Sequence, residues 1–173
     1  MKIHERKYYM KKLFSFLVCL GILLVFSCKN EEEDIFGKSS AVRLSEAVAD
    51  YTEYFKSAPN GWIMEYYPTS ASKGYNYVVK FNEDGSVLIG TKNEWTEKVY
   101  KEDTSLWEVI ADDGPVLSFN SYNEIFHLFS SPLYPGNDDI NKGTGLGGDY
   151  EFIILQPSED KNVITLKGKK RSA

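Results

Sequence analysis

The chain has 173 residues, of which 42% are hydrophobic and 26% charged, and its formal net charge is −5. This composition is ordinary for a globular protein and too apolar for a disordered one, and the length suits one domain. Only one acidic residue, Glu5, lies within residues 1–27, so the remainder of the chain is strongly acidic. Such a surface argues against binding nucleic acid or anionic lipid through charge, because both need a basic footprint.

The N-terminus has the pattern of a secretory signal peptide. The apolar run Leu13–Phe26 follows the basic residues Lys11 and Lys12. It is shorter than the roughly 20 apolar residues that a membrane-spanning helix needs. A basic head with a short apolar core is typical of a signal peptide. We therefore expect residues 1–27 to be removed and exclude them from the fold.

The apolar run ends in Val25-Phe26-Ser27-Cys28, which resembles the lipobox of bacterial lipoprotein precursors. The resemblance implies that the thiol of Cys28 is lipidated, that the chain is cut before it, and that the new amino terminus receives a further acyl chain such as palmitate. Several acyl chains together give stable membrane anchoring. The alternatives are a small core cysteine or half of a disulfide. Since Cys19 lies inside the signal peptide, the mature chain holds no second cysteine to pair with Cys28.

Residues 28–38 are expected to form a lipidated acidic tether. The stretch Lys29–Asp34 is polar and mostly acidic, which favours a solvated, self-repelling spacer. It also resembles the acidic export signal of many Bacteroidota lipoproteins, which implies an outer-membrane protein that faces the cell exterior. A lipoprotein that faces the periplasm and carries a polar tether is the alternative.

One amphipathic helix is predicted after Ser39 or Ser40, either of which suits an N-cap. Ala58-Pro59 and Asn60-Gly61 are expected to end it. Apolar residues recur at steps of three and four, which places them on one helical face. They are Leu44, Ala47, Val48, Tyr51, Phe55 and Ala58.

After Gly61 the apolar period changes to two, which indicates β-strands. Hairpin-length joints without helical patterns between them predict an antiparallel meander. The fold class expected is mainly β (α+β), with the N-terminal helix packed on eight to nine strands as a sandwich or a partly closed barrel, in a single domain, 39–173. The candidate strands are Trp62–Tyr67, Tyr75–Phe81, Ser86–Thr91, Leu106–Ala111, Pro115–Phe119, Glu124–Phe129, Asp149–Leu155 and Asn162–Lys167, with a weaker one around Trp95–Tyr100.

Five segments spread along the chain carry a family resemblance: Ser57–Trp62, Met64–Pro68, Gly114–Phe119, Gly147–Phe152 and Leu166–Arg171. In this order they resemble a Bacteroidota lipoprotein family known as domain-of-unknown-function family 4302. The resemblance implies an accessory lipoprotein encoded beside an outer-membrane nutrient-import system, and it carries over no catalytic residues. Because the family continues past the last segment, we expect a truncated member with an open sheet edge. The alternative is an edge protected by the charges that follow Ile164.

Few residues can carry catalysis or bind metal. His127 is the one histidine of the mature chain and lies between apolar neighbours, so it is expected to be a satisfied strand residue. Zinc is not expected, because zinc sites need several imidazole or thiolate ligands. Asp112 and Asp113 are adjacent but fall in a predicted turn, where carboxylates commonly bind backbone. Weak calcium candidates lie in an oxygen-rich loop, namely Asp138, Asp139 and Asp149. No cofactor is expected.

The high aromatic content, 14%, is the remaining functional signal. Flat rings on an exposed sheet face can bind the apolar faces of sugars, although aromatic residues also favour strands and fill cores. In Trp62–Tyr67 the aromatic residues occupy both alternating faces, and the two faces of a strand cannot both point into one core. The candidate ligand-binding residues are Trp62, Tyr66, Tyr67, Tyr75, Trp95 and Trp107.

Together these features predict a non-catalytic outer-membrane lipoprotein that binds a ligand or partner as an accessory to a nutrient-import system. The expected partners are the membrane, through the lipid anchor, outer-membrane import proteins, and a carbohydrate or peptide ligand, but not nucleic acid. One alternative is a structural or assembly component of the cell envelope. A secreted hydrolase that uses two carboxylates is another.

Overall fold

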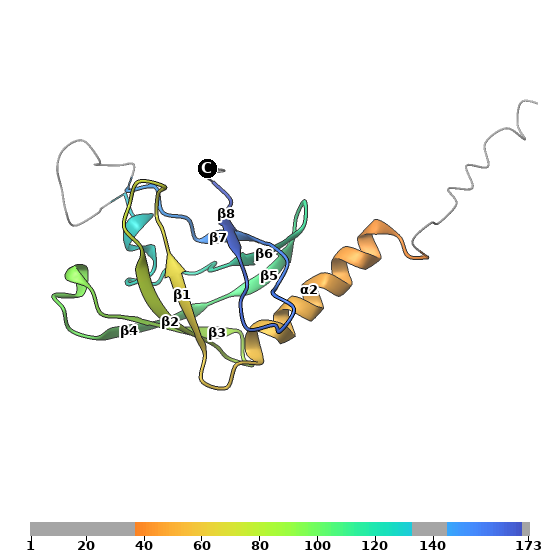
Figure 1. The fold of residues 1–173 in the computed structure, drawn as a ribbon, viewed down its shortest axis with the longest axis horizontal. Helices are drawn as coiled ribbons and strands as arrows, with labels where there is room; N and C mark the ends of the chain where they lie inside the picture. Colours follow the sequence, from red (N-terminus) through yellow and green to blue (C-terminus); the bar gives the residue numbers. More distant parts are fainter. Residues whose placement is uncertain (1–36, 133–144, 171–173) are drawn as a thin grey trace, which may run out of the picture. The chain divides into compact units, whose positions relative to one another are not determined.

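The structure is a computed structural model that describes residues 37–132 and 145–170. It contains one long helix and two antiparallel sheets (Figure 1). The elements in chain order are α2 (Ser40–Lys56), β1 (Trp62–Tyr66), β2 (Tyr75–Phe81), β3 (Ser86–Thr91), a 3-10 helix (Glu94–Thr96), β4 (Lys101–Leu106), β5 (Glu108–Ala111), β6 (Pro115–Ser118), a second 3-10 helix (His127–Phe129), β7 (Glu151–Ile154) and β8 (Leu166–Gly168).

The strands form two four-stranded sheets, β1-β2-β3-β4 and β5-β6-β7-β8, each in sequence order. Every neighbouring pair is antiparallel, so each sheet is a meander. The arrangement is sandwich-like and does not close into a barrel. The mainly β fold with one N-terminal helix and an antiparallel meander is therefore confirmed.

Helix α2 forms where the sequence predicted it, from Ser40 to Lys56. Leu44, Val48 and Tyr51 are partly buried on one side, and Phe55 in the last turn is the one buried residue of the helix. The helix packs on β5 and β6, while its N-terminal half extends past the sheets (Figure 1). Val48, Tyr51 and Phe55 therefore attach the helix to the core.

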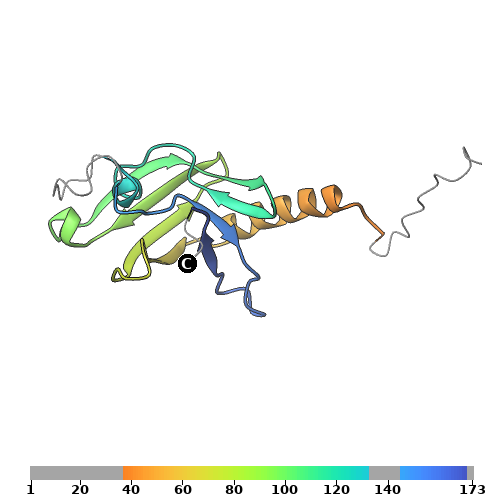
Figure 2. The same ribbon diagram turned by 90° about the horizontal axis from the view of Figure 1, so that it is seen from above.

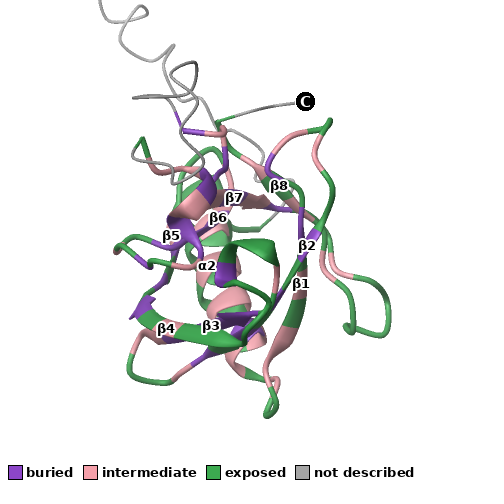
Figure 3. Cartoon of the chain, turned by 90° about the vertical axis from the view of Figure 1, so that its left-hand side faces the viewer, coloured by how far each residue is buried: buried purple, intermediate pink, exposed green. Residues whose placement is uncertain are grey.

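The core lies between the facing sides of the two sheets. Along β2 buried and exposed residues alternate without exception, as the two-residue period requires (Figure 3). The largest fully buried side chains are Tyr77, Phe119, Phe126, Phe129, Ile89 and Leu117. Each such apolar side chain contributes about 1.5–3 kcal/mol through burial. The core is thus unusually aromatic, which accounts for much of the aromatic content.

Two predicted strands do not form. Residues 124–129 are not a strand but a turn that leads into the 3-10 helix His127–Phe129. Asn123 causes this, because its side-chain oxygen accepts hydrogen bonds from the backbone N–H groups of Ile125 and Phe126. Likewise Asn93 caps a 3-10 helix through Trp95 N and Thr96 N, so the weak strand around Trp95–Tyr100 is wrong as well. Local side-chain bonds override strand propensity at both places.

Strands β1, β6 and β7 are one to three residues shorter than predicted, and two other predicted strands change more. The predicted strand Leu106–Ala111 is divided at Trp107 between β4 and β5, so that the chain passes from one sheet to the other at this residue. The last strand is shorter than predicted and runs from Leu166 to Gly168. Before it, Ser158 and Asp160 form a hydrogen-bonded turn that takes up the start of the predicted strand.

Within the described ranges, no helix is both long enough and apolar enough to cross a membrane.

Candidate functional site

A groove with a volume of about 1010 Å³ lies between strand β1 and strand β8. Each of these strands is the outer strand of its sheet, and they lie on the same side of the sandwich in both ribbon views (Figures 1 and 2). One wall is residues 62–70 and the other is residues 162–168. The floor consists of core side chains, including Phe55, Val79, Phe81, Leu117, Phe119 and Phe152. The groove is therefore a mostly apolar opening into the interior of the sandwich.

On the groove side, strand β1 has backbone N–H and C=O groups that form no hydrogen bonds within its own sheet. Asn82 N donates to Ser86 O, so the backbone groups of Asn82 face the β3 side. Because this direction alternates from one residue to the next, every second residue of β2 bonds to β3 and the residues between them bond to β1. With the observed register, Trp62, Met64 and Tyr66 are the β1 residues whose backbone groups bond to β2. The N–H and C=O groups of Ile63 and Glu65 consequently point away from β2, along the open edge.

The same reasoning applies to β8. Leu155 N donates to Thr165 O and Lys169 N donates to Glu151 O, so Thr165, Lys167 and Lys169 face β7. The backbone groups of Leu166 and Gly168 therefore point outward. The groove is bordered on both sides by open strand edges.

Side chains cross the groove at both of its ends. The hydroxyl of Tyr66 donates to Asp149 O at 3.0 Å, which joins the end of β1 to the segment before β7. At the other end, the hydroxyl of Tyr54 in α2 donates to Lys161 O at 2.7 Å in the turn before β8. Burial raises the pKa of the Tyr66 hydroxyl, so it remains a proton donor at any physiological pH. The first bond therefore ties the β1 wall to the segment before β7, and the second ties helix α2 to the turn before β8.

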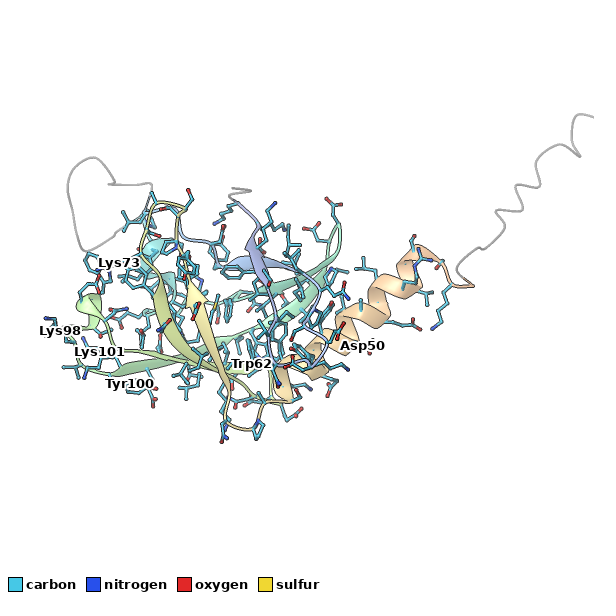
Figure 4. All side chains as sticks on the ribbon, viewed as in Figure 1. Asp50, Trp62, Lys73, Lys98, Tyr100 and Lys101 are labelled. Carbon is cyan, nitrogen blue, oxygen red and sulfur yellow. The ribbon has the colours of Figure 1, made fainter. Side chains whose placement is uncertain are left out.

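Trp62 lies at the α2 end of the groove (Figure 4). Its indole N–H donates to Phe55 O at 2.7 Å, and its ring lies 5.1 Å from that of Tyr54. The indole is therefore held in place before any ligand arrives, while part of its surface remains accessible. A rigid, half-buried aromatic ring is the kind of anchor that binding sites favour.

The structure divides the six aromatic candidates among three places. Trp62, Tyr66 and Tyr67 line the groove, but Tyr66 is only 4% exposed, whereas Tyr67 is 60% exposed. Tyr75, the cross-strand partner of Tyr66, is buried and does not line the groove, and its hydroxyl accepts a hydrogen bond from the indole N–H of Trp95 at 3.4 Å. Trp107 packs in the core on Phe81, with ring centroids 4.5 Å apart. Buried Tyr66, Tyr75 and Trp107 present no open ring face, so the six do not form one exposed aromatic platform.

The titratable candidates are engaged in structural bonds. Nδ1 of His127 accepts a hydrogen bond from Asn123 N at 3.1 Å, and burial lowers the pKa of the imidazole. This histidine is satisfied as expected, but in a 3-10 helix and not in a strand. The carboxylate of Asp112 pairs with Lys169 at 2.7 Å, and that contact holds the pKa of Asp112 below its usual value.

Of the calcium candidates, Asp138 and Asp139 lie outside the described residues. Asp149 is buried, and its Oδ1 accepts a hydrogen bond from Lys170 N at 3.0 Å. Among residues 37–132 and 145–170 there is no group of three or more His, Cys, Asp or Glu side chains that could hold a metal ion.

Sequence reasoning missed the second wall of the groove. In the predicted strand Asn162–Lys167, Ile164 and Leu166 share one face, and the structure leaves both only partly buried because they border the open edge of the sandwich. The alternation of these residues indicates that their side chains point inward. It does not indicate that they face β1 across a groove, because that depends on how the two sheets close. Met64, between the two aromatic wall residues, was also missed.

Comparison with known families identifies the class to which this fold belongs. A family described as a domain of unknown function, DUF4302, matches residues 32–173. Since this match covers most of the chain, the protein belongs to the DUF4302 family, as its segments predicted. Neither the curated proteins nor the solved structures gave a match.

Proposed function

We propose that this protein is a non-catalytic lipoprotein of a Bacteroidota outer membrane that binds a ligand or partner as an accessory to a nutrient-import system. The lipobox-like segment before Cys28 and the acidic tether after it support the address at the exterior face of that membrane. The observation that carries the binding role is the groove between β1 and β8, a preformed apolar hollow with a fixed aromatic residue at one end.

A binding role fits the chemistry of the described side chains better than hydrolysis does. A glycosidase needs two carboxyl groups that face each other across a substrate. Here Asp112 pairs with a lysine on the surface, and Asp149 accepts a hydrogen bond from the backbone. The groove is instead lined largely by apolar and aromatic side chains, which bind without chemical change.

The anchor leads to a direct prediction. Cys28→Ala is expected to abolish membrane retention or to leave an uncleaved precursor, because the acyl chains on the thiol supply the membrane affinity. Fractionation of cells that express the full chain measures this. Cys19→Ala is the matched control, since it removes the other cysteine but leaves processing intact. Normal cleavage and retention of Cys28→Ala would contradict the proposed anchor.

The binding role is tested with a charge placed on the groove wall. Leu166→Arg puts a guanidinium beside an apolar hollow, whereas Leu106→Arg places the same charge on β4, where Leu106 is 53% exposed and outside the groove. We expect outer-membrane import proteins to copurify with the unaltered lipoprotein and with Leu106→Arg. Leu166→Arg is expected to weaken this capture by about tenfold or more, equivalent to about 1.4 kcal/mol. Capture that is equal in all three proteins, or free of import proteins, would refute the role.

A further inference from the structure

We propose that the groove is a docking site for an extended peptide segment of a partner protein, which adds to strand β1 and pairs with the backbone of Ile63 and Glu65. This inference rests on the proposed binding function and specifies the chemistry of the occupant. Alternate side chains of the docked segment enter the groove, and the other side chains remain in solvent, as in other cases of strand addition.

The open backbone groups determine the class of occupant. An occupant that excludes water from the groove also covers the outward N–H and C=O groups of Ile63 and Glu65. A buried backbone group without a partner costs about 1–3 kcal/mol. A lipid chain offers no hydrogen bonds, and a sugar does not match the regular spacing of a strand edge. An extended polypeptide supplies donors and acceptors at that spacing.

The two outer strands of the first sheet, β4 and β1, differ in charge and in how their edges are covered, and this difference favours β1 as the docking edge. The outer strand β4 carries Lys101, Glu102 and Asp103, and charges of this kind discourage edge pairing. Its edge is also covered by the following loop, since Leu106 N donates to Ser121 Oγ at 2.7 Å. Strand β1 has one charged residue, Glu65, and in the described part of the chain no hydrogen bond covers its outward groups.

The side chains of β1 complete the complementarity. Trp62, Met64 and Tyr66 point toward the groove and are at least partly buried, while Ile63 is 69% exposed on the outer face of the sheet. An added strand would therefore meet a row of apolar side chains on one of its faces only. We expect the partner segment to alternate apolar and polar residues over about six residues, the usual length of a strand.

Because the outward N–H of Glu65 makes no bond to β2, it can be removed by proline without breaking the β1–β2 ladder. Glu65→Pro removes this donor, and Glu65→Ala removes only the side chain. The probe is a display library of short linear peptides selected on the unaltered protein. Enriched peptides are expected to alternate apolar and polar residues, to bind Glu65→Ala as well as the unaltered protein, and to bind Glu65→Pro at least about tenfold more weakly.

A second measurement does not depend on how the proline variant folds. An enriched peptide is resynthesised with N-methyl groups on alternate residues, which removes the donors on one edge of the strand, and its binding to the unaltered protein is measured. One of the two alternating patterns is expected to abolish binding and the other to preserve it. Failure to enrich peptides, or binding that neither methylation pattern affects, would overturn the proposal.

Other occupants give distinguishable results. If the protein is a dimer in solution and Glu65→Pro dissociates it, the occupant of the edge is a second copy of the chain. If the protein binds detergent or phospholipid, and Leu166→Arg abolishes this binding while Glu65→Pro preserves it, the occupant of the groove is a lipid. Either result overturns strand docking. If import proteins are captured through the groove but no peptide is enriched, the proposed function stands and this inference fails. If peptides dock but no import protein is captured, this inference stands and the proposed accessory role in import fails.

Discussion

Phe126→Ala is expected to lower the free energy of unfolding by about 3–5 kcal/mol, a large share of the 5–15 kcal/mol typical of a domain. Phe126 is 1% exposed, and its ring lies 4.4 Å from Phe119 and 5.5 Å from Tyr66. Truncation leaves a cavity where side chains from both sheets meet. Denaturant unfolding of the protein, followed by tryptophan fluorescence, measures the effect.

Tyr122→Ala is the control, because it removes a ring of similar size that is 69% exposed. This change is expected to alter stability by less than about 0.5 kcal/mol. Equal effects of the two substitutions would show that the region around Phe126 is not packed as the structure has it.

Asn123→Ala is expected to destabilise the protein by about 2–4 kcal/mol, since it leaves several buried polar groups without partners. The side chain of Asn123 is 0% exposed, and its oxygen accepts hydrogen bonds from Ile125 N and Phe126 N. Its amide group donates to Asp103 O on β4. The residue therefore shapes the turn and ties it to the first sheet.

The neighbouring Asn120 provides the matched comparison. It is exposed and donates one side-chain hydrogen bond, to Glu108, so Asn120→Ala is expected to change stability by less than about 0.5 kcal/mol. Thermal unfolding of both variants at one pH separates the two cases. A midpoint for Asn123→Ala that equals that of Asn120→Ala would contradict the proposed role of the turn.

Elements with a clear period were predictable from the sequence. Strand β2, Tyr75–Phe81, has the predicted bounds because its alternation is unbroken and the turn at Gly85 follows it. Strand β3 and helix α2 were found for the same reason, since one inward face is specified by several apolar residues.

Elements that depend on polar side chains were not predictable in this way. Strand β4 begins with Lys101, Glu102 and Asp103, so its hydrophobic pattern is weak, and it is held as a strand by pairing with β3. Conversely, Ile125–Phe129 has the composition of a strand, but the side chain of Asn123 directs the chain into a turn. Tertiary pairing decided the first case and a local hydrogen bond the second.

The candidate site was predictable only in part. The aromatic run Trp62–Tyr67 drew attention to strand β1, and Trp62 does line the groove, but whether it binds a ligand stays a prediction. The same argument could not exclude Trp107 and Tyr75, which fill the core. The opposite wall at Leu166 depends on the closure of two sheets, a long-range property that no local pattern contains.

Amide hydrogen exchange of strand β1 tests the central claim, that the groove between β1 and β8 is a binding site, most directly. The exchange rates are measured in the free protein and in its complex with the captured partner. The account predicts that the outward N–H groups of Ile63 and Glu65 exchange quickly in the free protein and at least about tenfold more slowly in the complex, because the partner becomes their acceptor. Unchanged exchange at these two positions, with protection appearing at β4 or on α2 instead, would contradict it.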